Sequence, residues 1–303
     1  MKILDFDAYD KKARDPAEAG GNKARCGWIL YTKEESVRNR PYIELYRRAG
    51  ELYQIKIALG IYKPPVCWDE AAKGELRRLW ERARPAFIIN RTRDYRISEA
   101  FESFGAPVYN SSLVARLGND KKAAYRFMQG RDIPIMPTVY GLQMPKQFPV
   151  IVKSAGGHGG TEVFYISDKS QWQEFVEWKR SRPEEEYIIQ KPASDLGRDL
   201  RVYIVGNQIK AALLRTSSQD FRSNHCLGGK EERYELSPAQ KSLVYAVAKP
   251  LDIGMAGIDF LFHHGQLVFN EIEDMAGARG LYELTDYDIA QDYIRYICSQ
   301  IFG

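Results

Sequence analysis

The sequence predicts an α/β protein in which a small parallel-sheet domain precedes a larger α+β region. From residue 27 to about residue 110, buried strand-like runs alternate with amphipathic helical patterns, which is typical of a parallel sheet. From about residue 111 onward, strand-like runs follow one another around short glycine turns, as antiparallel hairpins do. The 303 residues, 44% hydrophobic and 28% charged, suit a globular chain with two or three substructures.

The first 110 residues contain the alternating pattern. Residues 1–26 have one short apolar start and a polar remainder, and we interpret them as an extension of unknown role. Strands are predicted at 27–32, 52–59, 86–89 and 107–109, and helices at 40–52, 69–83 and 98–104. Residues 27–110 therefore form the predicted N-terminal domain. Its strands carry no glycine fingerprint for a dinucleotide.

The rest of the chain is divided into a predicted central subdomain, residues 111–185, and a C-terminal subdomain, residues 186–303. Helices are predicted at 120–129, 169–180, 237–251 and 286–302, and strands at 148–153, 162–166, 187–190, 199–205, 208–215, 255–262 and 267–273. Gly206-Asn207 gives a two-residue hairpin signal between two of these strands.

The loop from Ser154 to Thr161 is rich in glycine and joins two predicted strands. It lacks the lysine and the following helix of a Walker phosphate loop. Backbone N–H groups of such a loop can still bind phosphate, and the alternative is a mobile hairpin tip without a ligand. Lys153, at the base of the loop, favours a phosphate-binding flap.

Three carboxylates are set into the apolar hairpin near the C-terminus. Glu271 and Glu273 must share a face because strand side chains alternate. A three-residue loop, 264–266, would place Asp259 opposite Glu271, whereas a two- or four-residue loop would separate them. Three converging carboxylates suit Mg²⁺, and the alternative is a set of solvated edge acids. The flanking apolar residues favour the metal site.

Three arginines, Arg201, Arg215 and Arg222, would by themselves be read as surface residues. They become informative because the strands that carry two of them should run beside the acidic hairpin. His158 and His225 could accept a proton from an amine, although ordinary loop positions explain them better.

Bulk properties narrow the function classes. The formal charge of +4 fits an anionic small molecule at least as well as nucleic acid, and we expect no nucleic-acid partner. Four cysteines without metal or redox spacing indicate reduced thiols. No apolar run approaches the roughly 20 residues of a membrane span, so we expect a cytoplasmic protein without a membrane partner.

The order of motifs from about residue 110 to the C-terminus resembles the ATP-grasp superfamily. Within it, the resemblance is to the branch of the ribosomal-protein glutamate ligase and the lysine-biosynthesis carrier-protein ligase. The motifs are Asp120-Lys121, 149–153 with the glycine loop, 188–192, 197–201, Arg215, 220–224 with Gly228-Gly229, 257–259 and 271–273. The implied fold is an ATP-grasp fold in which two α+β subdomains clamp ATP behind a small parallel-sheet domain.

The resemblance also implies a role for each matching residue. The implied nucleotide-binding residues are Lys121, Lys153, Ser154, Gly156, Gly157, Gly159, Gly160, Gln190, Lys191, Asp199 and Arg201. The implied catalytic residues are Arg215, Arg222 and Asn224, and the implied metal ligands are Asp259, Glu271 and Glu273. Lys191 and Glu273 depart from the family pattern, which usually has an acidic residue and an asparagine at these positions. Leu227 and residues 275–279 depart from it too.

The function implied by the resemblance is an ATP-dependent carboxylate–amine ligase that forms an amide through an acyl phosphate. The implied cofactors are ATP and two Mg²⁺ ions, and the substrates are a small-molecule acid and an amine, with amino acids and peptides among the candidates. A homodimer is expected by analogy. The alternatives are a small-molecule kinase on the same fold and a non-catalytic ATP-binding module.

Overall fold

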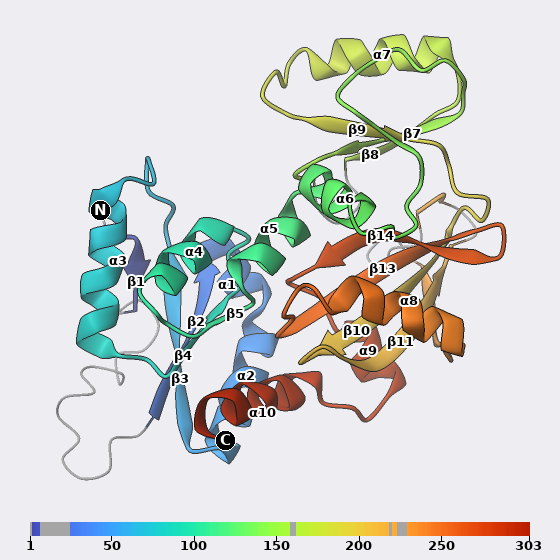
Figure 1. The fold of residues 1–303 in the computed structure, drawn as a ribbon. Helices are drawn as coiled ribbons and strands as arrows, with labels where there is room; N and C mark the ends of the chain where they lie inside the picture. Colours follow the sequence, from blue (N-terminus) through green and yellow to red (C-terminus); the bar gives the residue numbers. More distant parts are fainter. Residues whose placement is uncertain (1, 7–24, 158–161, 218–219, 223–228) are drawn as a thin grey trace.

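The computed structural model describes residues 2–6, 25–157, 162–217, 220–222 and 229–303 (Figure 1). Within these residues the strands form two five-stranded sheets and one four-stranded sheet. This mixed α/β architecture agrees with the predicted fold class. In the described part of the chain, we find no helix with the length and apolar character needed to cross a membrane.

The N-terminal sheet has the predicted parallel core. Its strands are β1 (Leu4–Asp5), β2 (Arg25–Thr32), β3 (Ile55–Tyr62), β4 (Phe87–Asn90) and β5 (Val108–Tyr109), in the order β1-β3-β2-β4-β5. The pairs β2–β3, β2–β4 and β4–β5 are parallel. The accompanying helices are α1 (Lys33–Arg38), α2 (Arg40–Leu52), α3 (Glu70–Ala83) and α4 (Tyr95–Ser103). The central strands are buried apolar runs, as expected for a sheet covered on both faces.

Part of the segment set apart as an extension belongs to this sheet. β1 pairs antiparallel with β3, and Ile3 and Leu4 are buried. β2 begins at Arg25, before the predicted domain start at residue 27. The few apolar residues near the start of the chain gave too short a pattern to reveal a strand.

The middle of the chain forms a four-stranded antiparallel sheet. Its elements are α5 (Ser112–Asn119), α6 (Lys121–Gln129), β6 (Thr138–Tyr140), β7 (Val150–Ser154), β8 (Val163–Ile166), α7 (Lys169–Lys179) and β9 (Tyr187–Gln190). The strand order is β6-β9-β7-β8. The predicted boundary after residue 185 precedes β9, but β9 pairs with β6 and β7, so this sheet extends to Gln190.

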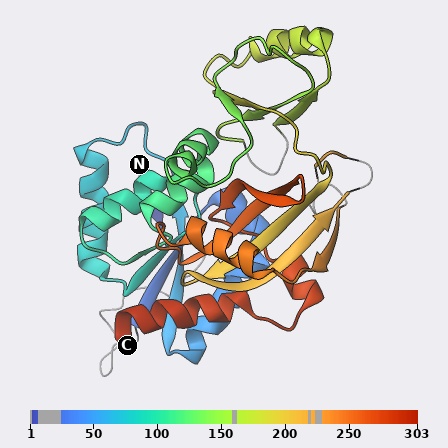
Figure 2. The same cartoon turned by 45° about the vertical axis from the view of Figure 1, so that its right-hand side comes forward.

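The C-terminal sheet is antiparallel, with the order β12-β11-β10-β13-β14. Its strands are β10 (Arg198–Val205), β11 (Gln208–Thr216), β12 (Lys230–Arg233), β13 (Met255–His263) and β14 (Gln266–Glu273). The helices are α8 (Pro238–Ala248), α9 (Arg279–Leu284) and α10 (Ile289–Phe302). α10 returns to α2, where the rings of Tyr46 and Tyr293 lie 6.1 Å apart (Figure 1). In both views the four-stranded sheet and α7 form a separate lobe above the C-terminal sheet (Figure 2).

The acidic hairpin has the predicted pairing but a different turn. His263 pairs with Gln266, so the loop has two residues and the predicted three-residue loop is wrong. Asp259 nevertheless lies opposite Glu271, because the register shifts between Asp259 and Phe260. The shift leaves Asn270 as the extra residue of a β-bulge. This extra residue, and not a turn with an odd number of residues, places Asp259 opposite Glu271.

The N-terminal domain is joined to the base of this hairpin by buried polar contacts. The Asn110 side-chain amide donates to Met255 O (2.7 Å), and its oxygen accepts from Met255 N (2.9 Å). Arg91, at the carboxyl end of β4, donates to Asp274 O (3.3 Å). Asp274 directly follows β14, so these bonds fix the acidic strands relative to the parallel sheet.

Candidate active site

A cleft lies between the four-stranded sheet and the C-terminal sheet. Its walls come from both lobes: residues 121, 151, 153, 157, 162, 163, 190, 191, 193, 195, 196, 198, 199, 221, 222, 261, 270 and 271. Thus most of the predicted nucleotide-binding positions described by the structure line one cavity. Half of these lining residues are charged, five lysines and arginines and four acids, and the others are apolar or neutral polar, which suits a small molecule that carries charged groups.

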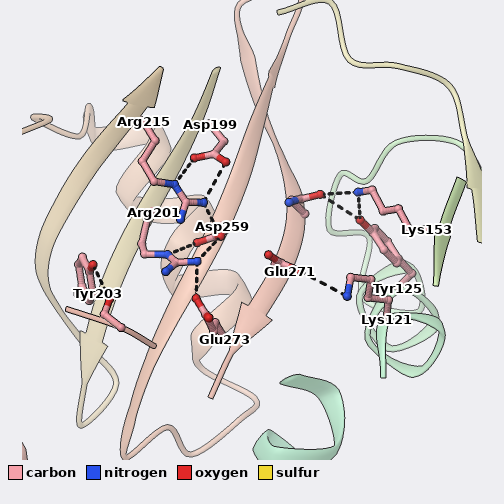
Figure 3. Close-up of polar contacts among 12 residues, drawn as sticks. Lys121, Tyr125, Lys153, Asp199, Arg201, Tyr203, Arg215, Asp259, Glu271 and Glu273 are labelled. Atoms are coloured by element: carbon pink, nitrogen blue, oxygen red, sulfur yellow. Dashed lines mark hydrogen bonds and ion pairs between the residues drawn. The ribbon is translucent and has the colours of Figure 1, made fainter. Parts of the chain in front are cut away.

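Two lysines face β14 from the other side of the cleft (Figure 3). Lys153 on β7 donates to Asn270 Oδ1 (2.7 Å) and to the Tyr125 hydroxyl (3.4 Å). Lys121, in the first turn of α6, contacts Gly157 O and lies 3.8 Å from Glu271. The Lys153 ammonium group therefore contacts neutral oxygens, and the Lys121 ammonium group contacts one neutral oxygen and a more distant carboxylate. Phosphate oxygens would be stronger partners for both lysines.

The lysines are placed by the local sequence. Asp120 caps α6, and its carboxylate accepts from Ala123 N (3.0 Å). This cap starts the helix at Lys121 and directs that side chain toward the cleft. Lys153 lies in an apolar strand, and its side chain is only 8% exposed. Burial lowers the pKa of Lys153 to about 8, although Glu271 and Asp199 favour its charged form. Burial also lowers the pKa of Lys121.

The resemblance implies that this cleft binds ATP, and we expect that binding to weaken as pH rises through 8. With a pKa of about 8, Lys153 is mostly protonated at pH 7 and mostly neutral at pH 9. Phosphate oxygens favour the protonated form, so the apparent affinity should fall about tenfold between these pH values. Titration calorimetry in buffers of different ionisation enthalpy should show proton uptake near pH 8.5. K153R, which stays charged over this range, should flatten the dependence, and an equally steep dependence in K153R would assign it to another group.

A buried network of arginines and carboxylates lies next to the lysines (Figure 3). Arg215 donates to both oxygens of Asp199 (2.5 and 2.9 Å) and to Asp259 Oδ2 (2.6 Å). Arg201 donates to both oxygens of Asp259 (2.8 and 2.7 Å) and pairs with Glu273. The register explains these contacts, because β10 lies between β11 and β13 and pairs Asp199 with Arg215 and Arg201 with Asp259.

The network keeps Asp259 ionised. Burial alone would raise the pKa of Asp259, but Arg201 and Arg215 outweigh it and lower the pKa to about 2. Glu273 differs, because burial exceeds the effect of Arg201 and raises its pKa. The two carboxylates lie on the same face of the sheet yet have opposite pKa shifts, since two guanidinium groups hold Asp259 and one holds Glu273.

The three predicted metal ligands lie on one face, but cations separate them. Among the residues with described positions, no three acidic, histidine or cysteine side chains gather into a ready metal site. Asp259 is held by two arginines and Glu273 by one, whereas Glu271 has no arginine contact among the described residues and lies 3.8 Å from Lys121. Glu271 is therefore the carboxylate best placed to receive an ion together with phosphate oxygens.

The other end of the cleft is formed by β9 and the chain after it. Gln190 is 2% exposed and its amide donates to Thr138 Oγ1 (2.8 Å). Lys191 lines the cleft with Ala193 and Leu196. Arg222 also lines the cleft, and its guanidinium pairs with Asp220 (2.8 Å).

The glycine loop is described only in part. Ser154, Gly156 and Gly157 are placed at the end of β7, and Gly157 lines the cleft. Gly159, Gly160, Asn224, His158, His225 and Leu227 lie outside the described residues. The assignments of the predicted site residues to ATP, catalysis and metal stay predictions.

Two polar residues that contact Lys153 in the cleft were missed in the sequence. Tyr125 is one helical turn after Lys121, and that spacing could have revealed it. Its hydroxyl lies within hydrogen-bond distance of Asn270 Oδ1 (3.4 Å) and Gln190 Oε1 (3.5 Å). Asn270 had no such signal, because strict alternation places it on the face opposite Glu271, and the bulge brings it into the cleft.

Comparison with known proteins gives a family and a fold. The family model for a RimK-like ATP-grasp domain matches residues 138–297. A protein of Coxiella burnetii named probable alpha-L-glutamate ligase is 30% identical over 212 residues, which cover 65% of this chain and 69% of that protein.

Solved structures are similar over nearly the whole chain. A RimK domain ATP-grasp protein from Sphaerobacter thermophilus is 18% identical with a TM-score of 0.67, covering 91% of this chain and 100% of the other. A D-alanine–D-alanine ligase from Bacillus anthracis, solved with ATP, is 16% identical with a TM-score of 0.65, covering 92% and 96%. At these identities the similarity establishes a shared fold.

Proposed function

The chain belongs to the RimK-like ATP-grasp family of ATP-dependent ligases, and we propose that it joins a carboxylate to an amine through an acyl phosphate. The observation that carries this proposal is the cleft between the two sheets, where Lys153 of the four-stranded sheet and Lys121 of α6 face Glu271 of the C-terminal sheet. Binding the triphosphate of ATP requires cationic side chains on one side and a metal-binding carboxylate on the other.

The proposed reaction has two steps. First, an oxygen of the substrate carboxylate attacks the γ-phosphorus of ATP, the bond to the β–γ bridging oxygen breaks, and ADP leaves. Second, the nitrogen of the amine attacks the acyl carbon, phosphate leaves with the bonding pair, and the nitrogen loses a proton. A carboxylate is a poor acylating agent, and phosphorylation supplies its leaving group.

In the first step we assign the two lysines to the phosphates. Lys153 would exchange its bond with Asn270 for a phosphate oxygen, and Lys121 would exchange the Gly157 carbonyl. Charge moves onto the β-phosphate as the bond breaks, so fixed cations at this position stabilise the transition state. Ser154, Gly156 and Gly157 would provide the start of the flap that excludes water from the acyl phosphate.

We assign Mg²⁺ to Glu271 and Glu273, with phosphate oxygens completing the coordination. The exposed side of Glu271 fits this role, and Asp259 would join only if one arginine turned away. A bound magnesium ion neutralises phosphate charge and orients the transferred group.

Arg215 and Arg201 have a positioning role in this proposal. They hold Asp199 and Asp259 by charge-assisted bonds, so the wall of the cleft next to the phosphates is rigid. Arg222 remains our candidate for the substrate side, because it lines the cleft from a different segment.

ADP release should show which substrates are joined. The protein is incubated with ATP, Mg²⁺ and pools of acids and amines, with L-glutamate in both because the relative from Coxiella is named a glutamate ligase. We expect ADP only when an acid and an amine are both present, together with a new amide by mass spectrometry. ADP with a phosphorylated product and no amine requirement would establish a kinase instead. Nucleotide binding without turnover in any pool would indicate a binding module.

A further inference from the structure

We propose that Tyr165 is a positioning residue that acts through Phe221 to hold Arg222 at the cleft. The proposal rests on the proposed function, since it concerns the same nucleotide cleft. Tyr165 lies on β8 in the four-stranded sheet, whereas Phe221 follows β11 of the C-terminal sheet. Their ring centroids are 5.7 Å apart and the ring planes are inclined by 47°. The pair therefore joins the two lobes directly.

Phe221 is fixed to the C-terminal lobe by its backbone. Gly197 N donates to Phe221 O (2.8 Å), and Ser217 N donates to Gly197 O (2.7 Å). The next residue is braced as well: the backbone N–H and Nε of Arg222 both donate to Asp220 Oδ1 (2.8 and 3.0 Å). The Arg222 guanidinium lies 5.2 Å from the Phe221 ring centroid. A displacement of the Phe221 ring should therefore also displace the Arg222 guanidinium.

Tyr165 contributes little to the core of its own lobe. The buried cluster under α7 includes Trp172 and Phe175, and Phe164 packs against it. Tyr165 points the opposite way because strand side chains alternate, and it is 37% exposed even with Phe221 beside it. Removing its ring should leave the folding of this lobe almost unchanged.

A bound nucleotide would affect the ring pair and the polar contacts across the cleft in different ways. The bond from Lys153 to Asn270 and the ion pair from Lys121 to Glu271 involve groups that phosphates and metal would recruit. The contact between Tyr165 and Phe221 is aromatic, so phosphate does not compete for it. It can hold the lobes in register while the polar contacts are exchanged, and this is why we assign it a positioning role.

Nucleotide release tests the proposal without any acid or amine. In Y165A, we expect a fluorescent N-methylanthraniloyl ATP to dissociate roughly 2- to 10-fold faster, the fold-change that corresponds to a ring pair of this kind. Y165F should behave as the wild type, because the ring and not the hydroxyl makes the contact. Y245A removes an exposed aromatic ring on α8 that does not line the cleft, and it should have no effect.

A double-mutant cycle shows whether Tyr165 acts through Phe221. If it does, Y165A/F221A should release nucleotide at nearly the rate of the single variants, whereas independent roles would multiply their effects. Wild-type release in Y165A, or multiplied effects in the double variant, would overturn the proposal. These outcomes are separate from the proposed ligase reaction, which fails only if ADP and amide do not form in the substrate pools.

Discussion

Replacing Arg215 with methionine should lower the free energy of unfolding by about 3–5 kcal/mol. The guanidinium is 4% exposed and makes three charge-assisted bonds, two to Asp199 and one to Asp259. Methionine fills much of the volume but leaves Asp199 without these bonds in a buried site. The cost comes from the carboxylates left behind more than from the lost pair. Urea denaturation followed by circular dichroism measures it.

A surface arginine in the same strand region provides the control. Arg198 pairs with Asp195 at 3.6 Å, with both side chains more than one-third exposed, so R198M should cost about 0–1 kcal/mol. The double variant D199N/R215M should be more stable than R215M, because it also removes the buried Asp199 charge that R215M leaves without its arginine. If R215M cost no more than R198M, the network would not be the electrostatic unit that we describe.

The amino-acid pattern correctly indicated that the strands carrying Arg201 and Arg215 lie near the acidic hairpin. The carboxylates of β13 and β14 need cationic partners, and β10 with Arg201 pairs with β13, while β11 with Arg215 pairs with β10. The helices predicted at 120–129 and 237–251 likewise begin within one residue of the starts of α6 and α8, which Asp120 and Ser237 cap with their side chains. Such features depend on neighbouring residues or on the sign of charges, so they can be predicted from a single sequence.

Non-local and irregular features were not accessible in this way. The bulge at Asn270 depends on how two strands meet, and nothing in residues 266–273 distinguishes it from a longer turn. β9 joins the four-stranded sheet by pairing with β7, more than thirty residues earlier. No local signal in the sequence therefore showed that the subdomain boundary lies after β9 and not before it. The same applies to Arg91, whose bond with Asp274 O crosses 183 positions.

The pattern could not show which cations meet the three acids of the hairpin. A carboxylate among apolar residues indicates a partner but not which partner. Asp259 is satisfied by Arg201 and Arg215, so its burial alone does not require a metal. The cation that satisfies a buried acid can only be identified once the neighbouring strand is known.

The variant E271Q should reduce ATP turnover in the productive substrate pool by at least about 100-fold, because changing a residue that only supports a metal ligand commonly costs 10- to 100-fold. Glu271 is the acid of the hairpin that no arginine holds in the described structure, and it faces both lysines across the cleft. Glutamine keeps the size and the hydrogen-bonding capacity but removes the charge that an ion needs. Turnover as a function of Mg²⁺ concentration separates weaker ion binding from a lower maximal rate.

The control for this variant is E186Q. Glu186 is also a glutamate paired with a lysine, Lys122 at 2.7 Å, but its side chain is 64% exposed and it does not line the cleft. It should retain full turnover. If E271Q stayed within threefold of the wild type at every Mg²⁺ concentration, Glu271 would not be a metal ligand. Magnesium would then have to be held by Glu273 and the phosphates, which requires Glu273 to leave Arg201. Loss of turnover in E271Q that higher Mg²⁺ restores would instead place the ion on Glu271, beside Lys121 and the phosphates.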